Sequence, residues 1–233
     1  MYQIKNTMKQ ELDTKVRAIV TGATGMVGEG VLHECLLDSN VEEVLVIGRR
    51  PCGIEHPKLK EIVHKDFYDF STIEEQLKNY NACFFCLGVS SVGMKEPEYY
   101  KLTYTLTMAL AKTVAKQNPD MTFCYVSGAG TDSSENGRLM WARVKGKTEN
   151  DLMKLPFKQV YNFRPAAIEA TKGLKNTLPY YKYFAWLIPV IRLVAPKYII
   201  RLKEIGIAMI KTVTKGYEKT ILEVTDILAL SKR

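Results

Sequence analysis

The sequence predicts an α/β protein, a doubly wound parallel sheet followed by a small C-terminal helical lid region. Three observations support this prediction: near-continuous apolar segments alternate with helical patterns, a glycine-rich turn joins the first such pair, and the composition suits a globular core. The chain has 233 residues, of which 46% are hydrophobic and 25% charged. This balance excludes a disordered or collagen-like protein and favours one sizeable domain.

Apolar runs of strand length recur through the first two thirds of the chain. Strands of a parallel sheet read as such runs because helices cover both faces of the sheet. We expect strands at Val16–Thr21, Val44–Ile47, Glu61–His64, Ala82–Leu87, Met121–Val126 and Gln159–Phe163. Helical spacing between them predicts helices at Met26–Leu37, Glu98–Gln117 and Leu139–Leu155. Later in the chain we expect a helical pattern over 199–213, a short strand at Thr220–Val224 and a last helix that begins at Thr225 or Asp226.

The excess of basic residues is confined to the C-terminal part of the chain. Residues 1–171 carry 21 basic and 21 acidic side chains, whereas residues 172–233 carry 12 basic and 4 acidic ones. We therefore distinguish residues 1–171, the sheet domain, from residues 172–233, a basic and aromatic lid segment that packs on the same domain. Such a local excess is typical of a segment that faces an anionic ligand, an acidic partner or a membrane surface.

The cysteines predict a reducing, intracellular setting. Five cysteines make an odd count, and residues 1–13 contain no apolar signal core. We therefore expect a cytoplasmic protein. Cys83 and Cys86 have the spacing of a metal-binding pair, but on a strand they point to opposite faces of the sheet. We interpret them as buried strand cysteines and expect no metal site.

A glycine-rich turn lies directly between the first predicted strand and the first predicted helix. Its spacing, G-x-x-G-x-x-G, allows a tight turn and lets backbone N–H groups approach a pyrophosphate closely. The N-terminus of the following helix favours the negative charge of that group. The turn predicts a dinucleotide site formed by Gly22, Ala23, Thr24, Gly25, Met26, Val27 and Gly28. The alternative is a turn that only joins packed elements.

The segment TGATGMVG resembles the short-chain dehydrogenase/reductase superfamily in its extended and atypical branches, including the NAD-dependent epimerase/dehydratase group. The resemblance implies a Rossmann fold that binds NAD or NADP. In relatives the residue that ends the second strand reads the adenosine ribose, and here Arg49 and Arg50 stand there without an acid. Because a guanidinium offers phosphate a planar fork of donors, we predict NADP over NAD. A solvated loop is the alternative for the two arginines.

Further positions match the superfamily in register over residues 16–168. Asp66 and Phe67 follow the third strand, where relatives carry an acid that contacts the adenine amino group. Leu87 and Gly88 follow the fourth strand, where relatives carry a glycine under the adenine ribose. An Arg-Pro turn follows the sixth strand, and the resemblance places three of its residues beside the nicotinamide: Pro165, Ala166 and Ile168. Termination of a strand by proline is the alternative there.

The catalytic pattern of the superfamily is present except at one position. Active relatives use a serine after the fifth strand and Tyr-x-x-x-Lys on the next helix, where the i, i+4 spacing puts both side chains on one face. Ser127 and Lys145 match this pattern, but Trp141 stands in place of the tyrosine. An indole N–H donates a hydrogen bond but has no ionisation that serves proton transfer near neutral pH. The resemblance therefore implies that the usual acid/base step is missing.

The surrounding residues resemble one atypical branch in particular. The stretch SGAGTDSS…WARVKGKTENDL is similar to the Tat-interacting-protein-like reductases, whose motif reads Tyr-x-x-x-Lys-Gly-x-x-Glu, and Glu149 keeps the last acid of that motif. A core aromatic in a shifted alignment is the alternative for Trp141. Four tyrosines near the predicted cleft are disfavoured as substitute acids: Tyr99, Tyr100, Tyr104 and Tyr125.

Residues 172–200 combine five cations with six aromatic side chains. Prolines and Arg192 interrupt the apolar run well short of the ~20 residues of a bilayer span, so we expect no transmembrane helix. We favour a lid over the cleft or packing on the domain. Docking on an anionic membrane surface and a contact in a homo-oligomer are the alternatives. Nucleic acid is disfavoured because no recognised nucleic-acid module is present.

Two function hypotheses follow. The first is an NADP-dependent reductase or epimerase-like oxidoreductase that acts on a small apolar or carbonyl substrate, and the preserved Ser127 and Lys145 motivate it. The second is a catalytically silent cofactor-sensing or scaffold protein, which Trp141 motivates. We favour membership of the oxidoreductase family and leave turnover open.

Overall fold

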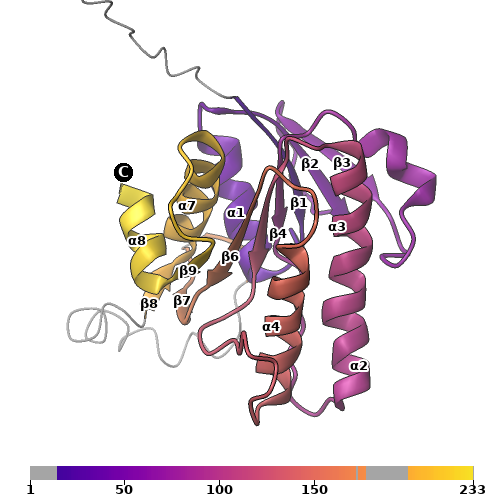
Figure 1. Cartoon of the computed structure of the whole chain (residues 1–233). Helices are drawn as coiled ribbons and strands as arrows, with labels where there is room; N and C mark the ends of the chain where they lie inside the picture. The colour runs from indigo at the N-terminus through magenta and orange to yellow at the C-terminus, as the bar shows by residue number, and fades with distance from the viewer. Residues whose placement is uncertain (1–14, 172, 177–198, 233) are drawn as a thin grey trace, which may run out of the picture.

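The computed structural model describes residues 15–171, 173–176 and 199–232. Its centre is a parallel sheet with the strand order β3-β2-β1-β4-β5-β6-β9 (Figure 1). All neighbouring strands of this sheet pair in parallel. The order reverses between β1 and β4, so a crevice opens at the carboxyl ends of these two strands, where doubly wound folds bind their ligands.

The elements lie close to the residues that the sequence predicts. The strands of the large sheet are β1 Val16–Thr21, β2 Val41–Gly48, β3 Leu59–Val63, β4 Ala82–Phe85, β5 Thr122–Val126, β6 Gln159–Arg164 and β9 Ile221–Glu223. The longer helices are α1 Met26–Leu37, α3 Leu106–Gln117, α4 Met140–Leu152, α7 Leu202–Thr214 and α8 Val224–Lys232. A 3₁₀ segment, η1, covers Ser71–Leu77. The alternation of strand and helix, and hence the doubly wound fold class, is confirmed.

Two features differ from the prediction. The helix expected at Glu98–Gln117 begins two residues earlier, and a wide π-helical turn, η2 at Lys101–Thr105, separates α2 Glu96–Tyr100 from α3. A second, two-stranded sheet pairs β7 Ala167–Glu169 with β8 Ile199–Arg201. Three-residue strands give no clear periodicity, and this explains why the sequence pattern did not reveal β7 and β8.

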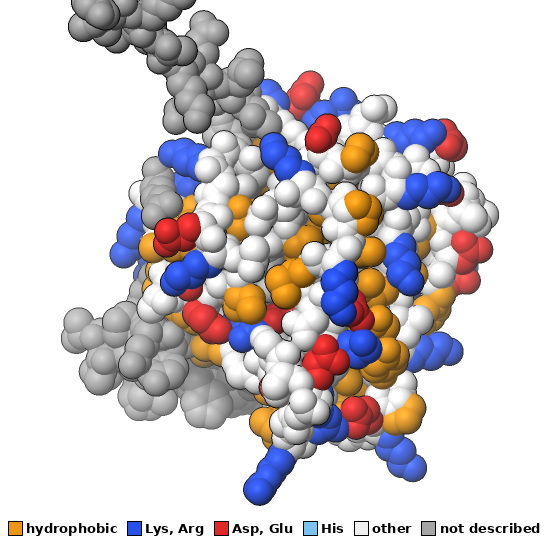
Figure 2. All heavy atoms as spheres, viewed as in Figure 1, with side chains coloured by type: hydrophobic (Ala, Val, Ile, Leu, Met, Phe, Trp, Pro, Cys, Tyr) orange, Lys and Arg blue, Asp and Glu red, His pale blue; other side chains and the backbone are white. Residues whose placement is uncertain are grey.

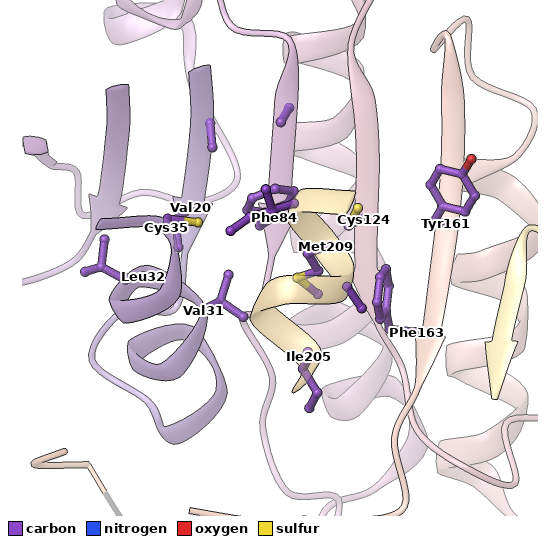
Figure 3. Close-up of a cluster of buried hydrophobic side chains, with 14 of the residues drawn as sticks. Val20, Val31, Leu32, Cys35, Phe84, Cys124, Tyr161, Phe163, Ile205 and Met209 are labelled. Atoms are coloured by element: carbon purple, nitrogen blue, oxygen red, sulfur yellow. The ribbon is translucent and has the colours of Figure 1, made fainter. Parts of the chain in front are cut away.

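Helices cover both faces of the large sheet and produce two apolar layers. On one face, α1 and α7 pack on β1, β4, β5 and β6, and Figure 3 shows Val31, Ile205 and Met209 with Phe84 and Phe163 in this layer. On the other face, η1, α3 and α4 cover a layer rich in aromatic rings. Cys83 belongs to the second layer and Cys86 packs against the first, so the two thiols lie on opposite faces, as the spacing predicts.

The C-terminal part of the described chain belongs to the core of the sheet domain. Its strand β9 pairs with β6, and α7 packs tightly on α1. The tight packing depends on two glycines, because a Cβ at Gly30 would lie 2.9 Å from the Leu202 Cβ and one at Gly206 would lie 2.8 Å from the Glu34 Cβ. Residues 199–232 therefore complete the large parallel sheet and form part of its core.

Residues 177–198, which carry the six aromatic side chains of residues 172–200, lie outside the described residues, and so do the expectations for those side chains. None of the helices in the described ranges combines the length and hydropathy of a membrane span. On the face shown in Figure 2, where α3 and α4 lie, basic and acidic side chains are interspersed.

Candidate functional site

The glycine-rich turn has the geometry of a phosphate cradle. Gly22 has a φ of +75°, and a Cβ there would lie 2.8 Å from the Cys86 carbonyl oxygen. A Cβ at Gly28 would overlap the Gly22 carbonyl oxygen, so the first turn of α1 lies directly against the loop. Only glycine fits at either position. Gly25 forms the N-cap of α1 and has no side chain, and the first N–H groups of a helix have no acceptor within that helix. These N–H groups are the donors that a pyrophosphate requires.

A cavity of about 480 Å³ adjoins this turn at the carboxyl ends of β1, β2 and β4. The glycine turn contributes Gly22, Ala23 and Thr24 to its lining, and the end of β2 contributes Gly48, Arg49 and Arg50. Phe67 and Leu87 supply apolar walls. Arg49 and Arg50 are exposed and form no ion pair with a described residue. The cavity therefore combines a phosphate cradle, an apolar slot and two free cations.

Other predicted cofactor residues lie beside this cavity without lining it. Asp66 is exposed, and its carboxylate accepts a hydrogen bond of 2.9 Å from the Tyr68 backbone N–H. Gly88 faces open space, because no heavy atom lies within 4 Å of the place where its Cβ would stand. The contacts of Asp66 and Gly88 with a cofactor stay predictions, and so do those of Gly25, Met26, Val27 and Gly28 at the start of α1.

Ser127 lies at the end of β5 and points into the protein. Only 5% of its surface is exposed. Its hydroxyl donates to Glu149 Oε1 at 2.5 Å, and the Phe163 carbonyl oxygen lies 3.1 Å away. The two residues that are exposed just after it, Ala129 and Gly130, carry no hydroxyl. The arrangement brings Ser127 to the predicted place in the fold, but its hydroxyl is engaged by the protein.

Lys145 and Trp141 share one face of α4 near the end of β5. The Lys145 ammonium donates to the Ser127 carbonyl oxygen. Burial lowers the pKa of Lys145 to about 8, and the nearby Glu149 carboxylate partly opposes this shift. Trp141 is half-buried, and its Cη2 would lie 3.6 Å from a Cβ at Gly130. The structure thus groups Ser127, Lys145 and Trp141, and it places an indole on the face of α4 that carries Lys145.

A buried ion network stands behind these residues. Glu149 is 0% exposed, and its carboxylate accepts two hydrogen bonds from the Arg164 guanidinium, at 3.0 and 2.5 Å. Arg164 also donates to the Ser133 hydroxyl at 2.6 Å and lies 3.4 Å from the Glu223 carboxylate. The network joins α4, β6, β9 and the loop before α4. It gives Arg164 a buried role that the Arg-Pro motif did not reveal.

The four tyrosines near the predicted cleft are poorly placed for proton transfer. Tyr99 and Tyr125 are buried, and burial raises the pKa of each. Tyr104 donates to the Asp151 carboxylate at 2.8 Å, and burial together with this carboxylate raises its pKa. Tyr100 packs on Tyr104 with ring centroids 4.6 Å apart. None of these hydroxyls lines the cavity beside the glycine turn.

The Arg-Pro turn connects to the end of β5. The Pro165 carbonyl oxygen accepts a hydrogen bond of 2.9 Å from the Ala129 N–H. Ala166 and Ile168 are partly buried and pack against the layer under α1 and α7. Their predicted place beside a nicotinamide remains a prediction.

Sequence reasoning missed a second buried carboxylate, Glu29 in the first turn of α1. Only 4% of it is exposed, and its two oxygens accept backbone N–H groups of Lys175 and Asn176 at 2.8 and 2.7 Å. The chain after the sheet domain is thereby tied to the helix that carries the glycine turn. The sequence offered no signal for this contact, because its partners are backbone groups that are distant along the chain.

These features fit a dinucleotide and nothing in them requires a metal. The glycines clear the space that a pyrophosphate would fill, the α1 N-terminus supplies donors, and the cavity has the size of a small-molecule site. Within the described ranges, His, Cys, Asp and Glu form no cluster that could hold a metal ion.

Fungal proteins named FMP52 are similar to this chain in sequence. The chain is 30% identical to protein FMP52-1 of Scheffersomyces stipitis over 169 residues, which cover 69% of this chain and 73% of the relative. It is 29% identical to FMP52 of Candida glabrata over 171 residues, or 71% of each chain. The names of these relatives describe them as mitochondrial. The expectation of a cytoplasmic protein is therefore wrong.

Solved structures share the fold at low sequence identity. A Bordetella bronchiseptica enzyme, WbmF, in complex with NAD⁺ superposes with a TM-score of 0.64 at 14% identity, over 94% of this chain and 77% of WbmF. The ADP-L-glycero-D-manno-heptose-6-epimerase of Helicobacter pylori gives 0.65 at 13% identity, over 97% and 84% of the two chains. Residues 18–138 match the sequence model of the NAD dependent epimerase/dehydratase family, and they include most of β1, the glycine turn and β5. The chain belongs to the NAD dependent epimerase/dehydratase family.

Proposed function

We propose that the chain binds NADP(H) at the glycine turn, with the adenosine 2′-phosphate against Arg49 and Arg50. The observation that carries this proposal is the pair of exposed guanidiniums, free of described ion-pair partners, at the mouth of the cavity. In the Rossmann fold a cofactor with a free 2′-hydroxyl is read by an acid at this place, and the end of β2 has none. Two cations favour the extra phosphate of NADP over the hydroxyl of NAD.

The rest of the cofactor would follow the edge of the sheet. The donors at the start of α1 would hold the pyrophosphate, and Phe67 and Leu87 would flank the adenine ring. Lys145 would reach the nicotinamide ribose from α4. A bound nicotinamide supplies hydride transfer, and the chain's own residues decide whether a proton can accompany it.

The proposed reductase lacks the usual proton donor. Trp141 replaces the tyrosine that serves as the acid in active relatives, and the tyrosines considered as substitutes are buried or engaged. A reductase acting on a small apolar or carbonyl substrate would have to take its proton from water or from Lys145. With a pKa of about 8, Lys145 is the titratable group of α4 nearest to neutrality that this face offers.

A second candidate is a cofactor-sensing or scaffold protein that binds NADP(H) without turnover. The engaged Ser127 hydroxyl and the indole of Trp141 favour it. Both candidates share the cofactor site and differ only in the chemistry.

The cofactor preference is tested by titrating the wild type and Arg49→Asp with NADPH and with NADH, followed by nicotinamide fluorescence. We expect the wild type to prefer NADPH, and the variant to lose about 10- to 100-fold in NADPH affinity, the effect of a lost charge-assisted contact. Lys112→Asp, which changes an exposed cation on α3 away from the cavity, is the matched control. Equal preference for the two nicotinamides in the wild type would refute the role of the arginines.

The two candidates are separated by a turnover screen. Wild type and Trp141→Tyr are mixed with NADPH and a panel of aldehydes and ketones, and the loss of NADPH absorbance is followed. Rapid turnover by the wild type would dismiss the silent candidate. Tight NADPH binding with turnover in Trp141→Tyr alone would support it, because the variant restores the family's acid.

A further inference from the structure

The network around Glu149 is joined to Lys145 by hydrogen bonds of Ser127. The Ser127 hydroxyl donates to Glu149, whereas the Ser127 carbonyl oxygen accepts from the Lys145 ammonium. Ser127 is therefore held from both sides, once by its side chain and once by its backbone. Lys145 and Glu149 are also four residues apart on α4, so they share one face of that helix.

Glu149 itself is fixed by bonds that leave it little freedom. Both of its oxygens accept from Arg164, and Arg164 is only 8% exposed. Arg164 is in turn anchored to Ser133 and Glu223, which lie on different segments of the chain. A buried, bidentate pair with further hydrogen bonds is rigid, because any shift leaves a charge without partners in a medium of low polarity.

We propose that Glu149 is a positioning residue that fixes Lys145 toward the nicotinamide ribose through Ser127, and that Arg164 holds Glu149 in place. This inference rests on the proposed cofactor site. It assigns Ser127 to the support of Lys145 instead of to contact with a substrate carbonyl. On this inference the serine serves cofactor binding, which does not need a tyrosine at position 141.

The test compares a ligand that reaches Lys145 with one that does not. NADPH contains the nicotinamide ribose, whereas adenosine 2′,5′-bisphosphate contains only the part that faces Arg49, Arg50 and the glycine turn. Their affinities are measured for the wild type, for Ser127→Ala and for the double variant Glu149→Gln, Arg164→Gln, which removes both buried charges together. The more exposed ion pair between Arg143 on α4 and Glu96 on α2 supplies the control variant Arg143→Gln, Glu96→Gln.

We expect the double variant to bind NADPH about tenfold more weakly, the equivalent of losing one or two hydrogen bonds, while its affinity for the bisphosphate is unchanged. Ser127→Ala should show the same pattern to a smaller extent, and it decides the question if the double variant does not fold. Unchanged NADPH affinity in Ser127→Ala and the double variant, or an equal loss for both ligands, would overturn the inference. Failure of the wild type to bind either ligand would instead refute the cofactor site itself, and this inference with it.

Discussion

The two halves of the sheet edge differ in how their side chains are engaged. In the half formed by β1, β2 and β4, the glycine turn faces a cavity. Arg49 and Arg50 also line this cavity, and neither forms an ion pair with a described residue. Around β5, α4 and β6, the polar groups bond to each other: Ser127 to Glu149, Glu149 to Arg164 and Lys145 to the Ser127 backbone. The first half is built to receive an anion, whereas the second is largely satisfied within the protein.

On the proposed function, this difference separates cofactor binding from chemistry within one fold. A nucleotide site depends on backbone shape and on cations, both of which the chain keeps. On the proposed function, proton transfer depends on one ionisable hydroxyl, and the resemblance to active relatives implies that Trp141 stands in its place. The fold class is therefore a better guide to the ligand that the chain binds than to the reaction that it catalyses.

The largest effect is expected from a change in the cradle. Gly28→Ala places a methyl group against the Gly22 carbonyl oxygen, so the turn must open or α1 must shift. We expect NADPH affinity to fall by more than about 100-fold and stability to fall by several kcal/mol. Calorimetric titration and thermal unfolding measure both. Gly88→Ala, where the Cβ meets open space, should leave stability near the wild-type value. If Gly28→Ala kept the wild-type affinity and stability, the half around β1, β2 and β4 would not depend on the shape of the glycine turn, and the comparison between the two halves would fail.

The second-largest effect is expected in the half around β5, α4 and β6. Glu149→Leu leaves the Arg164 charge buried without its main partner, and we expect a loss of about 3–5 kcal/mol in the free energy of unfolding. Denaturant unfolding measures it. The more exposed pair Arg143–Glu96 should be worth about 1 kcal/mol or less. Equal losses at the two pairs would show that the network around Glu149 is no more than a surface ion pair.

A smaller, pH-dependent effect is expected from Lys145. Burial lowers its pKa from 10.5 to about 8 in the folded chain, so the unfolded chain binds more protons between these values. The stability of the wild type should therefore rise as the pH increases from about 8 to about 10.5, by about 2–3 kcal/mol. Lys145→Met removes the titrating group and should lack this rise. Unfolding curves measured over this pH range give the free energy of unfolding at each pH. If this free energy changed with pH equally in the two proteins, the result would contradict the buried position of the ammonium.

Much of the fold could be predicted because its signals are local. The apolar runs of β1, β4 and β5 and the helical spacing of α1 lie within single windows of sequence, and α1 was predicted to the residue. The short strands β7 and β8 were missed because three residues set no period. The closure of the sheet by β9 and the packing of Gly30 on Leu202 depend on residues far apart in the chain.

The candidate site divides in the same way, into features with local sequence signals and contacts between distant segments. The lining by the glycine turn, Arg49, Arg50 and Phe67 follows from motifs that stand directly after strands. By contrast, the bonds of Glu149 to Arg164 and of Glu29 to residues 175 and 176 join segments that no motif connects. The direction of the Ser127 hydroxyl also depends on these distant partners. The motif predicts the position of Ser127 after β5, but it does not indicate that the hydroxyl bonds to Glu149.

The central claim is that a nicotinamide dinucleotide binds at the glycine turn with its 2′-phosphate on Arg49 and Arg50. The most direct measurement is a calorimetric titration of the full chain with NADPH at neutral pH, alone and with excess adenosine 2′,5′-bisphosphate. The account predicts saturable binding to one site per chain, which the bisphosphate competes away. The absence of saturable binding, or binding that the bisphosphate leaves unchanged, would contradict it.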